Sequence, residues 1–252
     1  MKVVTFNIRG DFGVDGRNDF CHRKPLILHK LAQEQPDIIG FQEVLPHVAA
    51  WMRQELTAYD VVGCGRKKDL TGEQMTVVYR RDKYQLLAMQ TYWLSPTPHV
   101  PGSRYAEQSW CPRTATELVL RDVDTGKVFR VVNTHLDHEG TLARQLGLKQ
   151  ILRHLESLDF FPDAPVVLMG DFNAPPDSEE MQAFGQYPGY TNATADMGAT
   201  FHGFMTARVQ EQIDYIYFKG GIRAVSAVKW MDAVDGVCLS DHYPVCVQAL
   251  LE

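Results

Sequence analysis

The chain has 252 residues and a formal net charge of −6, with 45% hydrophobic and 22% charged residues. This length and balance predict one large folded domain over residues 1–252 and exclude an intrinsically disordered protein. The acidic balance argues against a protein that binds long nucleic acids through its overall charge, because like charges repel.

The five cysteines are scattered and form no CxxC pair, which argues against a disulfide framework and a structural zinc site. We therefore expect a reducing compartment, the cytoplasm. The first residues, MKVVTFN, read as a buried strand instead of a signal segment. No apolar run is long enough to span a bilayer, so no membrane partner is expected. The oligomeric state stays open.

Short apolar runs bounded by turn residues predict strands, and apolar residues at helical spacing predict helices between some of them. In chain order, the predicted elements are a strand at 3–8, a helix through 26–32 that stops before Pro36, a strand at 38–43, a helix at 48–56, strands at 76–80, 116–121 and 128–135, a helix at 142–155, and strands at 166–170, 213–218 and 245–250. The stretch 76–135 reads as strands in succession. This mixture predicts an α/β fold in which two sheets pack together with helices outside.

Several predicted strands end in a carboxylate, an amide or an imidazole instead of a turn residue. Strand ends are rigid places at which a scaffold can hold site residues. Asn7 ends VVTFN, although an isolated amide there is more often a hydrogen-bonded turn residue. Glu43 ends DIIGFQE, where a buried carboxylate is costly unless it is paired or binds a cation.

The run VFRVVNTHLDH carries polar residues at the end of the strand predicted at 128–135. Strand alternation places Asn133, His135 and Asp137 on one face if the strand continues. A lone histidine or aspartate near a strand end is usually structural, and Asp137 and His138 are interpreted in that way.

The run VVLMGDFN is a more specific signal, because a fully apolar strand breaks at Gly170 and then presents Asp171 and Asn173. Asp171 alone would also fit a turn or a helix cap. An acid and an amide two residues apart at a strand end suit a site for a phosphate or a metal ion.

Asp214 lies in the apolar, aromatic run QIDYIYF, where an unpaired carboxylate is disfavoured. The adjacent pair Asp241 and His242 offers it a partner. An aspartate that accepts a hydrogen bond from a histidine fixes the tautomer and raises the basicity of the imidazole. We therefore expect Asp214 and His242 to act together.

In the order FNIRG, QE, NTHL, GDFN, QIDYIY and SDH, these motifs resemble the endonuclease/exonuclease/phosphatase superfamily, which includes deoxyribonuclease I. The resemblance runs from Val3 to Val245, and six ordered motifs make a chance match improbable. It implies a four-layer α/β/β/α sandwich of two mixed β-sheets flanked by helices. It also implies that the site lies at one end of the paired sheets.

The same resemblance implies roles for the strand-end residues. The implied metal-binding residues are Glu43, Asn7 and Asp241, and the implied catalytic residues are His135, Asp171, Asn173, Asp214 and His242. Asp171 resembles the residue that orients or deprotonates the attacking water, and His135 and Asn173 resemble donors to the phosphoryl oxygens. Carboxylate and amide oxygens suit Mg²⁺ or Mn²⁺, which is therefore the expected cofactor.

Two further residues are interpreted as substrate-binding. Arg113, in SWCPRTATELVL, fits a positive clamp on the phosphate, because this segment resembles a bacterial branch of the superfamily that carries an arginine here. A surface arginine is an equally good interpretation. His202, in ATFHGF, recurs in the same branch and is either a substrate-binding or a structural residue.

The expected activity is metal-dependent hydrolysis of a P–O bond by in-line attack of water. The expected partner is a small phosphorylated metabolite, such as a sugar phosphate or a phosphodiester. The alternative is a metal-dependent nuclease, which would need a basic, aromatic-lined groove for its nucleic acid. A binding module without catalysis is less expected, because Glu43 and Asp214 would then be unexplained buried carboxylates.

Two sets of residues that could serve a nucleic acid or a lipid substrate are interpreted otherwise. The basic runs at 66–68 (Arg66, Lys67, Lys68) and 80–83 are expected to be solvated surface. Trp51, Trp93 and Trp110 could supply the exposed anchor that a lipid substrate calls for, but they are expected in the core, as is usual for tryptophans in and beside strands. Nucleic acid is therefore kept as the second partner only.

Overall fold

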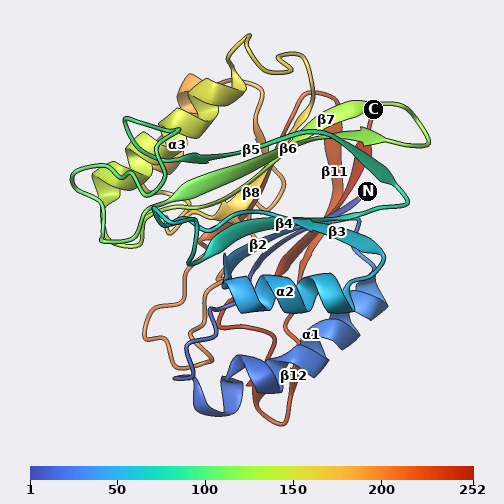
Figure 1. Cartoon of the computed structure of the whole chain (residues 1–252), viewed down its shortest axis with the longest axis vertical. Coiled ribbons are helices and arrows are strands. Elements are labelled where there is room, and N and C mark those ends of the chain that lie inside the picture. Colours follow the sequence, from blue (N-terminus) through green and yellow to red (C-terminus); the bar gives the residue numbers. More distant parts are fainter.

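Two six-stranded β-sheets pack face to face in the computed structural model, which describes all 252 residues (Figure 1). The strands of the first sheet, in spatial order, are β11 (Ile222–Lys229), β14 (Val245–Leu251), β1 (Lys2–Asn7), β2 (Ile38–Val44), β4 (Gln74–Arg80) and β3 (Tyr59–Val62). Those of the second sheet are β5 (Tyr84–Trp93), β6 (Thr114–Asp122), β7 (Val128–His135), β8 (Val166–Asp171), β10 (Asp214–Lys219) and β9 (Thr191–Asn192).

Each sheet contains one parallel pair among antiparallel ones: β1 with β2, and β7 with β8. Both sheets are therefore mixed. A separate two-stranded ribbon is formed by β12 (Ala233–Val234) and β13 (Val237–Cys238). Two 3₁₀ helices, η1 (Gly16–Asn18) and η2 (Met181–Gln186), lie in the connections.

Helices cover the outer face of each sheet, which gives the predicted four-layer sandwich. In Figure 1, α1 (Phe20–Glu34) and α2 (Pro46–Glu55) lie on one side of the paired sheets and α3 (Thr141–Leu155) lies on the other. Strand alternation divides the core between these layers. Val3 of β1 packs between the two sheets, whereas the next residue, Val4, packs under α1 and α2. No helix of the structure has the length and apolarity needed to cross a membrane.

Local sequence explains where the predicted helices begin and end. Pro46 is the first residue of α2, a position at which the missing N–H would have no helical partner anyway. At the end of α1, Gln35 adopts a left-handed conformation with φ 45°, and its N–H donates to the carbonyl of Leu31. The helix thus ends before Pro36, as the sequence predicts. All eight predicted strands and three predicted helices are present, whereas the remaining strands, β3, β5, β9, β11, β12 and β13, have no individually predicted counterpart.

The topology brings the carboxyl ends of four central strands, β1, β2, β7 and β8, to one end of the sandwich. Strand β10 is antiparallel to β8 and begins at this end, because its first residue pairs with the last residue of β8. The two chain termini lie together at the opposite end (Figure 1). Residues at these strand ends therefore face one another across the two sheets.

Candidate active site

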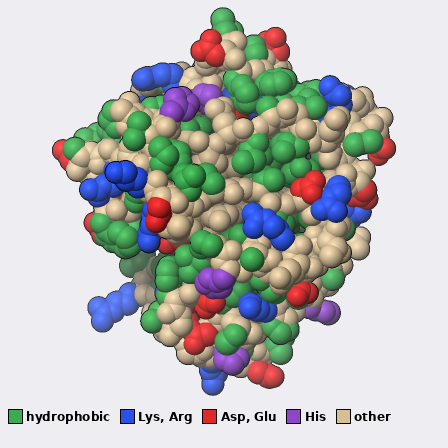
Figure 2. Space-filling view, in the orientation of Figure 1, with side chains coloured by type: hydrophobic (Ala, Val, Ile, Leu, Met, Phe, Trp, Pro, Cys, Tyr) green, Lys and Arg blue, Asp and Glu red, His purple; other side chains and the backbone are tan.

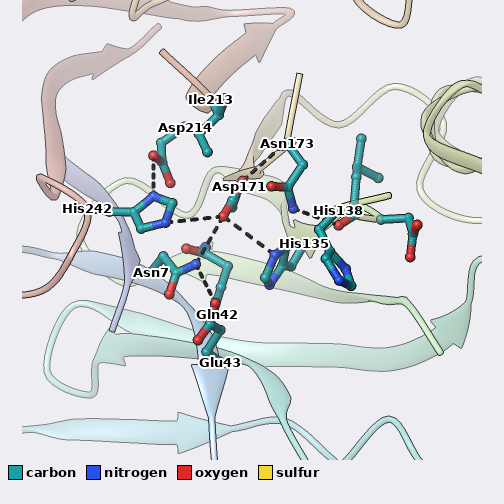
Figure 3. A network of polar contacts seen from close by, with 12 residues as sticks. Asn7, Gln42, Glu43, His135, His138, Asp171, Asn173, Ile213, Asp214 and His242 are labelled. Atoms are coloured by element: carbon teal, nitrogen blue, oxygen red, sulfur yellow. Dashed lines mark hydrogen bonds and ion pairs between the residues drawn. The ribbon is translucent and has the colours of Figure 1, made fainter. Parts of the chain in front are cut away.

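The strand ends bring the predicted polar residues into one network, drawn in Figure 3. These residues are Asn7 at the end of β1, Glu43 near the end of β2, His135 at the end of β7, Asp171 at the end of β8, and Asp214 at the start of β10. The two sheets are joined here directly, because the Asn7 amide donates to Asp171 Oδ2 over 3.0 Å.

A β-bulge positions Glu43. The pairing of β2 with β4 shifts register between Phe41 and Val44. In a regular strand Gln42 and Glu43 would point to opposite faces, but both lie in the network (Figure 3). Gln42 donates to Asn133 Oδ1 in the other sheet over 2.7 Å. The backbone of Glu43 is left-handed, with φ 61°, a strained conformation that is found at functional sites.

The Glu43 carboxylate is held by two hydrogen bonds. Asn7 Nδ2 donates to Oε1 over 3.0 Å, and the backbone N–H of Gly10 donates to Oε2 over 2.9 Å. Burial alone would raise the pKa of Glu43, but these two hydrogen bonds, together with the positive charges of His242 and Arg9, outweigh it and lower the pKa below its ordinary value. The side chain is therefore a preformed anion at the edge of the network.

Asp241 is a second carboxylate beside Glu43. Ser240 Oγ donates to its Oδ1 over 3.1 Å, and Arg9 Nε lies 3.9 Å from its Oδ2. Burial raises the pKa of Asp241, and the negative charge of Glu43 adds to that rise. Two neighbouring carboxylates of this kind favour the presence of a cation.

Asp171 lies at the centre of the network. In addition to the Asn7 contact, its Oδ2 lies 3.5 Å from His135 Nε2, and its Oδ1 accepts from the backbone N–H of Asn173 over 2.9 Å. Burial, reinforced by the negative charge of Asp214, raises the pKa of Asp171 to about 7. A carboxylate with this pKa is suited to exchange protons near neutral pH.

His242 lies between two carboxylates. Its Nδ1 is 2.9 Å from Asp214 Oδ2, and its Nε2 is 3.8 Å from Asp171 Oδ2. Burial disfavours the charged imidazole, but the charge and hydrogen bond of Asp214 overcome this and raise the pKa of His242 to about 10. The three side chains also offer metal-ligand atoms within 4.8 Å of one another.

His135 has the opposite electrostatic environment from His242. The side chain is buried, and burial followed by the positive charges of Arg113 and Arg66 lowers its pKa well below the ordinary value. His135 is therefore a neutral imidazole beside Asp171. Its Nδ1 is buried without a hydrogen-bond partner in the protein.

The GDFN motif forms the turn that carries Asp171. A Cβ at Gly170 would lie 2.0 Å from the carbonyl oxygen of Thr134 on β7, so the close approach of the two strands requires glycine. Asn173 is left-handed, with φ 49°, which asparagine tolerates better than most residues. Its Nδ2 donates to the carbonyl of Leu136 over 3.1 Å, which fixes the turn.

These residues surround a cavity of about 590 Å³. Of the predicted site residues, those that line it are Glu43, Arg113, His135, Asp171, Asn173, Asp241 and His242. Asn7 and Asp214 lie behind this lining and are hydrogen-bonded to it. His202 is not part of the lining; its ring is fully buried, stacks on Tyr243 at 4.1 Å, and accepts from the N–H of Met205.

The expectation that 66–68 is solvated surface is wrong for its first residue. Lys67 and Lys68 are exposed, but Arg66 is buried, lines the cavity, and pairs with Glu73 at 2.8 Å. Arg113 is also buried, so the interpretation as a surface arginine is excluded. No local pattern distinguishes Arg66 from the lysines that follow it.

The expectation that Trp110 belongs to the core is also wrong, although Trp93 is buried as expected. Trp110 is 74% exposed and Phe12 is 51% exposed, and both line the cavity. They also line an adjoining cavity of about 440 Å³, which shares Arg66 and Glu73 with the first. Aromatic side chains thus form part of the rim of the site.

Asp137 leaves the face on which strand alternation would place it, because β7 ends at His135. It accepts hydrogen bonds from the backbone N–H groups of Ser109 and Gly140 and lies 3.5 Å from Arg113 Nε. Its pKa falls to about 2 because these and other hydrogen bonds outweigh the effect of burial. Asp137 thereby joins two loops at the edge of the cavity.

Comparison with known proteins gives a consistent family relationship. A model of the endonuclease/exonuclease/phosphatase family matches residues 4–242. An endonuclease/exonuclease/phosphatase from Bacteroides vulgatus is 33% identical, with a TM-score of 0.92, over 100% of this chain and 98% of that chain. A mannosyl-6-phosphatase from Bacteroides thetaiotaomicron is 26% identical, with a TM-score of 0.90, over 99% of each chain. Nocturnin from Drosophila melanogaster is 32% identical over an alignment of 169 residues that covers 62% of this chain but only 24% of nocturnin.

Proposed function

Because the chain belongs to the endonuclease/exonuclease/phosphatase family, and is therefore a phosphoesterase, we propose that it uses a divalent metal ion and water to hydrolyse a small phosphorylated metabolite. A sugar phosphate is the first candidate. The observation that carries the proposal is the convergence of Glu43, Asp171 and the Asp214–His242 pair on one cavity. A volume of about 590 Å³ suits a small molecule. The similarity to a mannosyl-6-phosphatase over 99% of both chains supports the choice of a sugar phosphate.

The charge of the cavity fits a bound cation. Five carboxylates line it (Glu43, Glu73, Asp171, Glu211, Asp241), against three arginines (Arg9, Arg66, Arg113) and the charged imidazole of His242. An anionic phosphate would be repelled unless this excess were neutralised. Glu43, Asp241 and Asn7 provide the oxygen donors that Mg²⁺ and Mn²⁺ prefer, and we assign these three residues to the metal. When bound, the ion supplies positive charge to the phosphoryl oxygens.

The remaining residues of the network perform the proton and charge steps of the proposed reaction. Asp171 orients the attacking water and accepts its proton. His135 and Asn173 donate hydrogen bonds to the phosphoryl oxygens, on which negative charge accumulates in the transition state. Asp214 holds His242 in its charged form beside them, so that the imidazolium also stabilises that charge.

One face of the molecule (Figure 2) and the net charge of the chain favour a small substrate over a long nucleic acid. Figure 2 shows the face in the orientation of Figure 1, on which Lys and Arg side chains are scattered among acidic ones and form no continuous stripe. The net charge of −6 points in the same direction. The exposed ring of Trp110 at the rim offers a surface for the apolar face of a sugar, but a nucleobase could stack on it equally well, so this residue does not separate the two substrate classes.

A substrate panel tests the proposal. Phosphate release from hexose 6-phosphates is measured beside hydrolysis of bis(p-nitrophenyl) phosphate and of single-stranded and duplex oligonucleotides, with Mg²⁺ or Mn²⁺ and with Asp171→Asn as the blank. We expect phosphate release from at least one small ester that is lost in the variant. Cleavage of oligonucleotides alone would replace the proposal with a nuclease.

A further inference from the structure

Two buried arginines border the cavity beside the catalytic network. Arg66 is 6% exposed and Arg113 is 4% exposed. Each keeps one guanidinium nitrogen, Nη1, without a hydrogen-bond partner in the protein. A buried donor without an acceptor costs free energy, and the cost is larger for a charged group. Two such donors on residues that line the same cavity therefore indicate a place for an anionic acceptor.

Each guanidinium has an acidic neighbour that orients it but does not use all its donors. Arg66 Nη2 lies 2.8 Å from Glu73 Oε1, and Arg113 Nε lies 3.5 Å from Asp137 Oδ2. Arg113 Nη2 also contacts His138 Nδ1 at 2.8 Å. Burial, together with the positive charge of Arg66, lowers the pKa of Arg113, which shows that the two cations lie close enough to interact.

The backbone around Arg66 is fixed before any ligand binds. Its N–H donates to the carbonyl of Glu73, and its carbonyl accepts from Trp93 Nε1 over 2.6 Å. The preceding residue must be Gly65, because a Cβ there would lie 2.3 Å from the carbonyl oxygen of Leu70. The hairpin between β3 and β4 thus presents Arg66 rigidly, as a binding site requires.

The charge of the phosphate decides which ester such a pair would favour. The second pKa of a phosphate monoester is about 6, so at neutral pH it carries close to two negative charges. A diester carries one charge and has one terminal oxygen fewer. Arginine binds phosphate oxygens through its planar fork of donors. We infer that Arg66 and Arg113 together bind the doubly charged phosphate group and make the enzyme a phosphomonoesterase; this inference rests on the proposed function and names its substrate class.

The test compares two esters in one set of variants. The kcat and KM values for p-nitrophenyl phosphate and bis(p-nitrophenyl) phosphate are measured with Mg²⁺ for wild type, Arg66→Met, Arg66→Lys and the control Lys68→Met, which changes an exposed residue of the same hairpin. We expect Arg66→Met to lower kcat/KM for the monoester by about 10- to 100-fold, the range of a charged hydrogen bond, and for the diester by less than about threefold. Arg66→Lys should recover part of the loss, and Lys68→Met should change neither rate.

A second readout does not depend on turnover. Binding of inorganic phosphate is measured by calorimetry, and we expect Arg66→Met to bind it at least about tenfold more weakly than wild type. If Arg66→Met folds poorly, the double variant Arg66→Met/Glu73→Gln takes its place, because it removes both partners of the ion pair and leaves no unpaired buried charge. It should show the same loss of phosphate binding.

The outcomes separate this inference from the proposed function. Equal losses for the two esters, or unchanged phosphate binding in the folded variants, would overturn the inference. An enzyme that hydrolyses neither ester would contradict the proposed function and, with it, the assignment as a phosphomonoesterase, whereas an active enzyme with equal losses would overturn the inference alone.

Discussion

Asp171 and Asp214 stand directly opposite each other in the register of β8 and β10, and His242 lies between their carboxylates. The imidazole is 2.9 Å from Asp214 and 3.8 Å from Asp171. A positive ring at this place offsets the repulsion between two buried carboxylates. The arrangement therefore couples the charge of His242 to that of the residue that is proposed to accept the proton from water.

We predict that His242→Ala and Asp214→Asn each lower kcat by about 10²- to 10⁴-fold, because either change removes the held imidazolium. The double variant should be no worse than the more damaging single variant, because the two residues act as a unit. Turnover measured at saturating substrate checks both points. His29→Ala, at an exposed position of α1, serves as the control. Wild-type turnover in either single variant would remove that residue from the mechanism.

Gly170 offers a test of how the turn carries Asp171. We predict that Gly170→Ala abolishes most activity and destabilises the fold by on the order of 1–3 kcal/mol, because the new Cβ would collide with the carbonyl of Thr134. Gly185→Ala is the matched control, since a Cβ there meets no atom within 4 Å. Activity and urea unfolding are measured for both. A Gly170→Ala enzyme that behaves like the control would show that the turn does not need glycine.

The sequence predicts most of this site because its residues obey local rules. An apolar strand that ends in a carboxylate, as at Glu43 and Asp171, must lead to a partner or a cation, since burial of a lone charge is too costly. The same reasoning assigns Asp214 a partner, and the structure shows that partner to be His242. Likewise, short apolar runs predict strands, and apolar residues at helical spacing predict helices between some of them. Together they predict two sheets with helices outside, which is the observed fold.

The parts that the sequence does not predict depend on contacts between distant segments. Arg66 differs from Lys67 and Lys68 only because the hairpin turns it toward Glu73 and Trp93. Trp110 is exposed because no segment covers its loop, which hydrophobicity alone does not reveal. The edge strand β11 alternates between partly buried and exposed residues, so it lacks the apolar run that marks a central strand.

A buried ion pair away from the site, between Glu117 on β6 and Arg130 on β7, makes a prediction about stability. The pair is 2.6 Å apart and fully buried, and His154 of α3 lies 2.7 Å from the same carboxylate. We predict that Glu117→Gln lowers the free energy of unfolding by about 3–5 kcal/mol at pH 7, because Arg130 loses its counter-charge. Urea denaturation measures this change, and Glu55→Gln, on the exposed face of α2, should change it by less than about 0.5 kcal/mol.

The same variant has a predicted pH dependence. Burial would raise the pKa of Glu117, but the hydrogen bond of His154 and the charge of Arg130 lower it below the ordinary value of 4.5. Its stabilising contribution is therefore complete above pH 4.5 and is lost as the pH falls through the lower folded-state value. The difference in unfolding free energy between wild type and Glu117→Gln should shrink over that acidic range. A difference that grows on acidification would contradict the assigned direction.

The most direct experiment is a metal titration of Glu43→Gln, which keeps the shape of the side chain but removes its charge. Protein stripped with a chelator is supplied with increasing Mg²⁺ or Mn²⁺, and phosphate release from a hexose 6-phosphate is followed for wild type, Glu43→Gln and the exposed control Glu55→Gln. We predict that the ion restores activity in wild type and in the control. Glu43→Gln should need a far higher metal concentration and should stay below wild-type turnover at saturation. Equal metal dependence in all three proteins, or full wild-type activity in the chelator, would contradict a metal-dependent phosphoesterase that is built on Glu43.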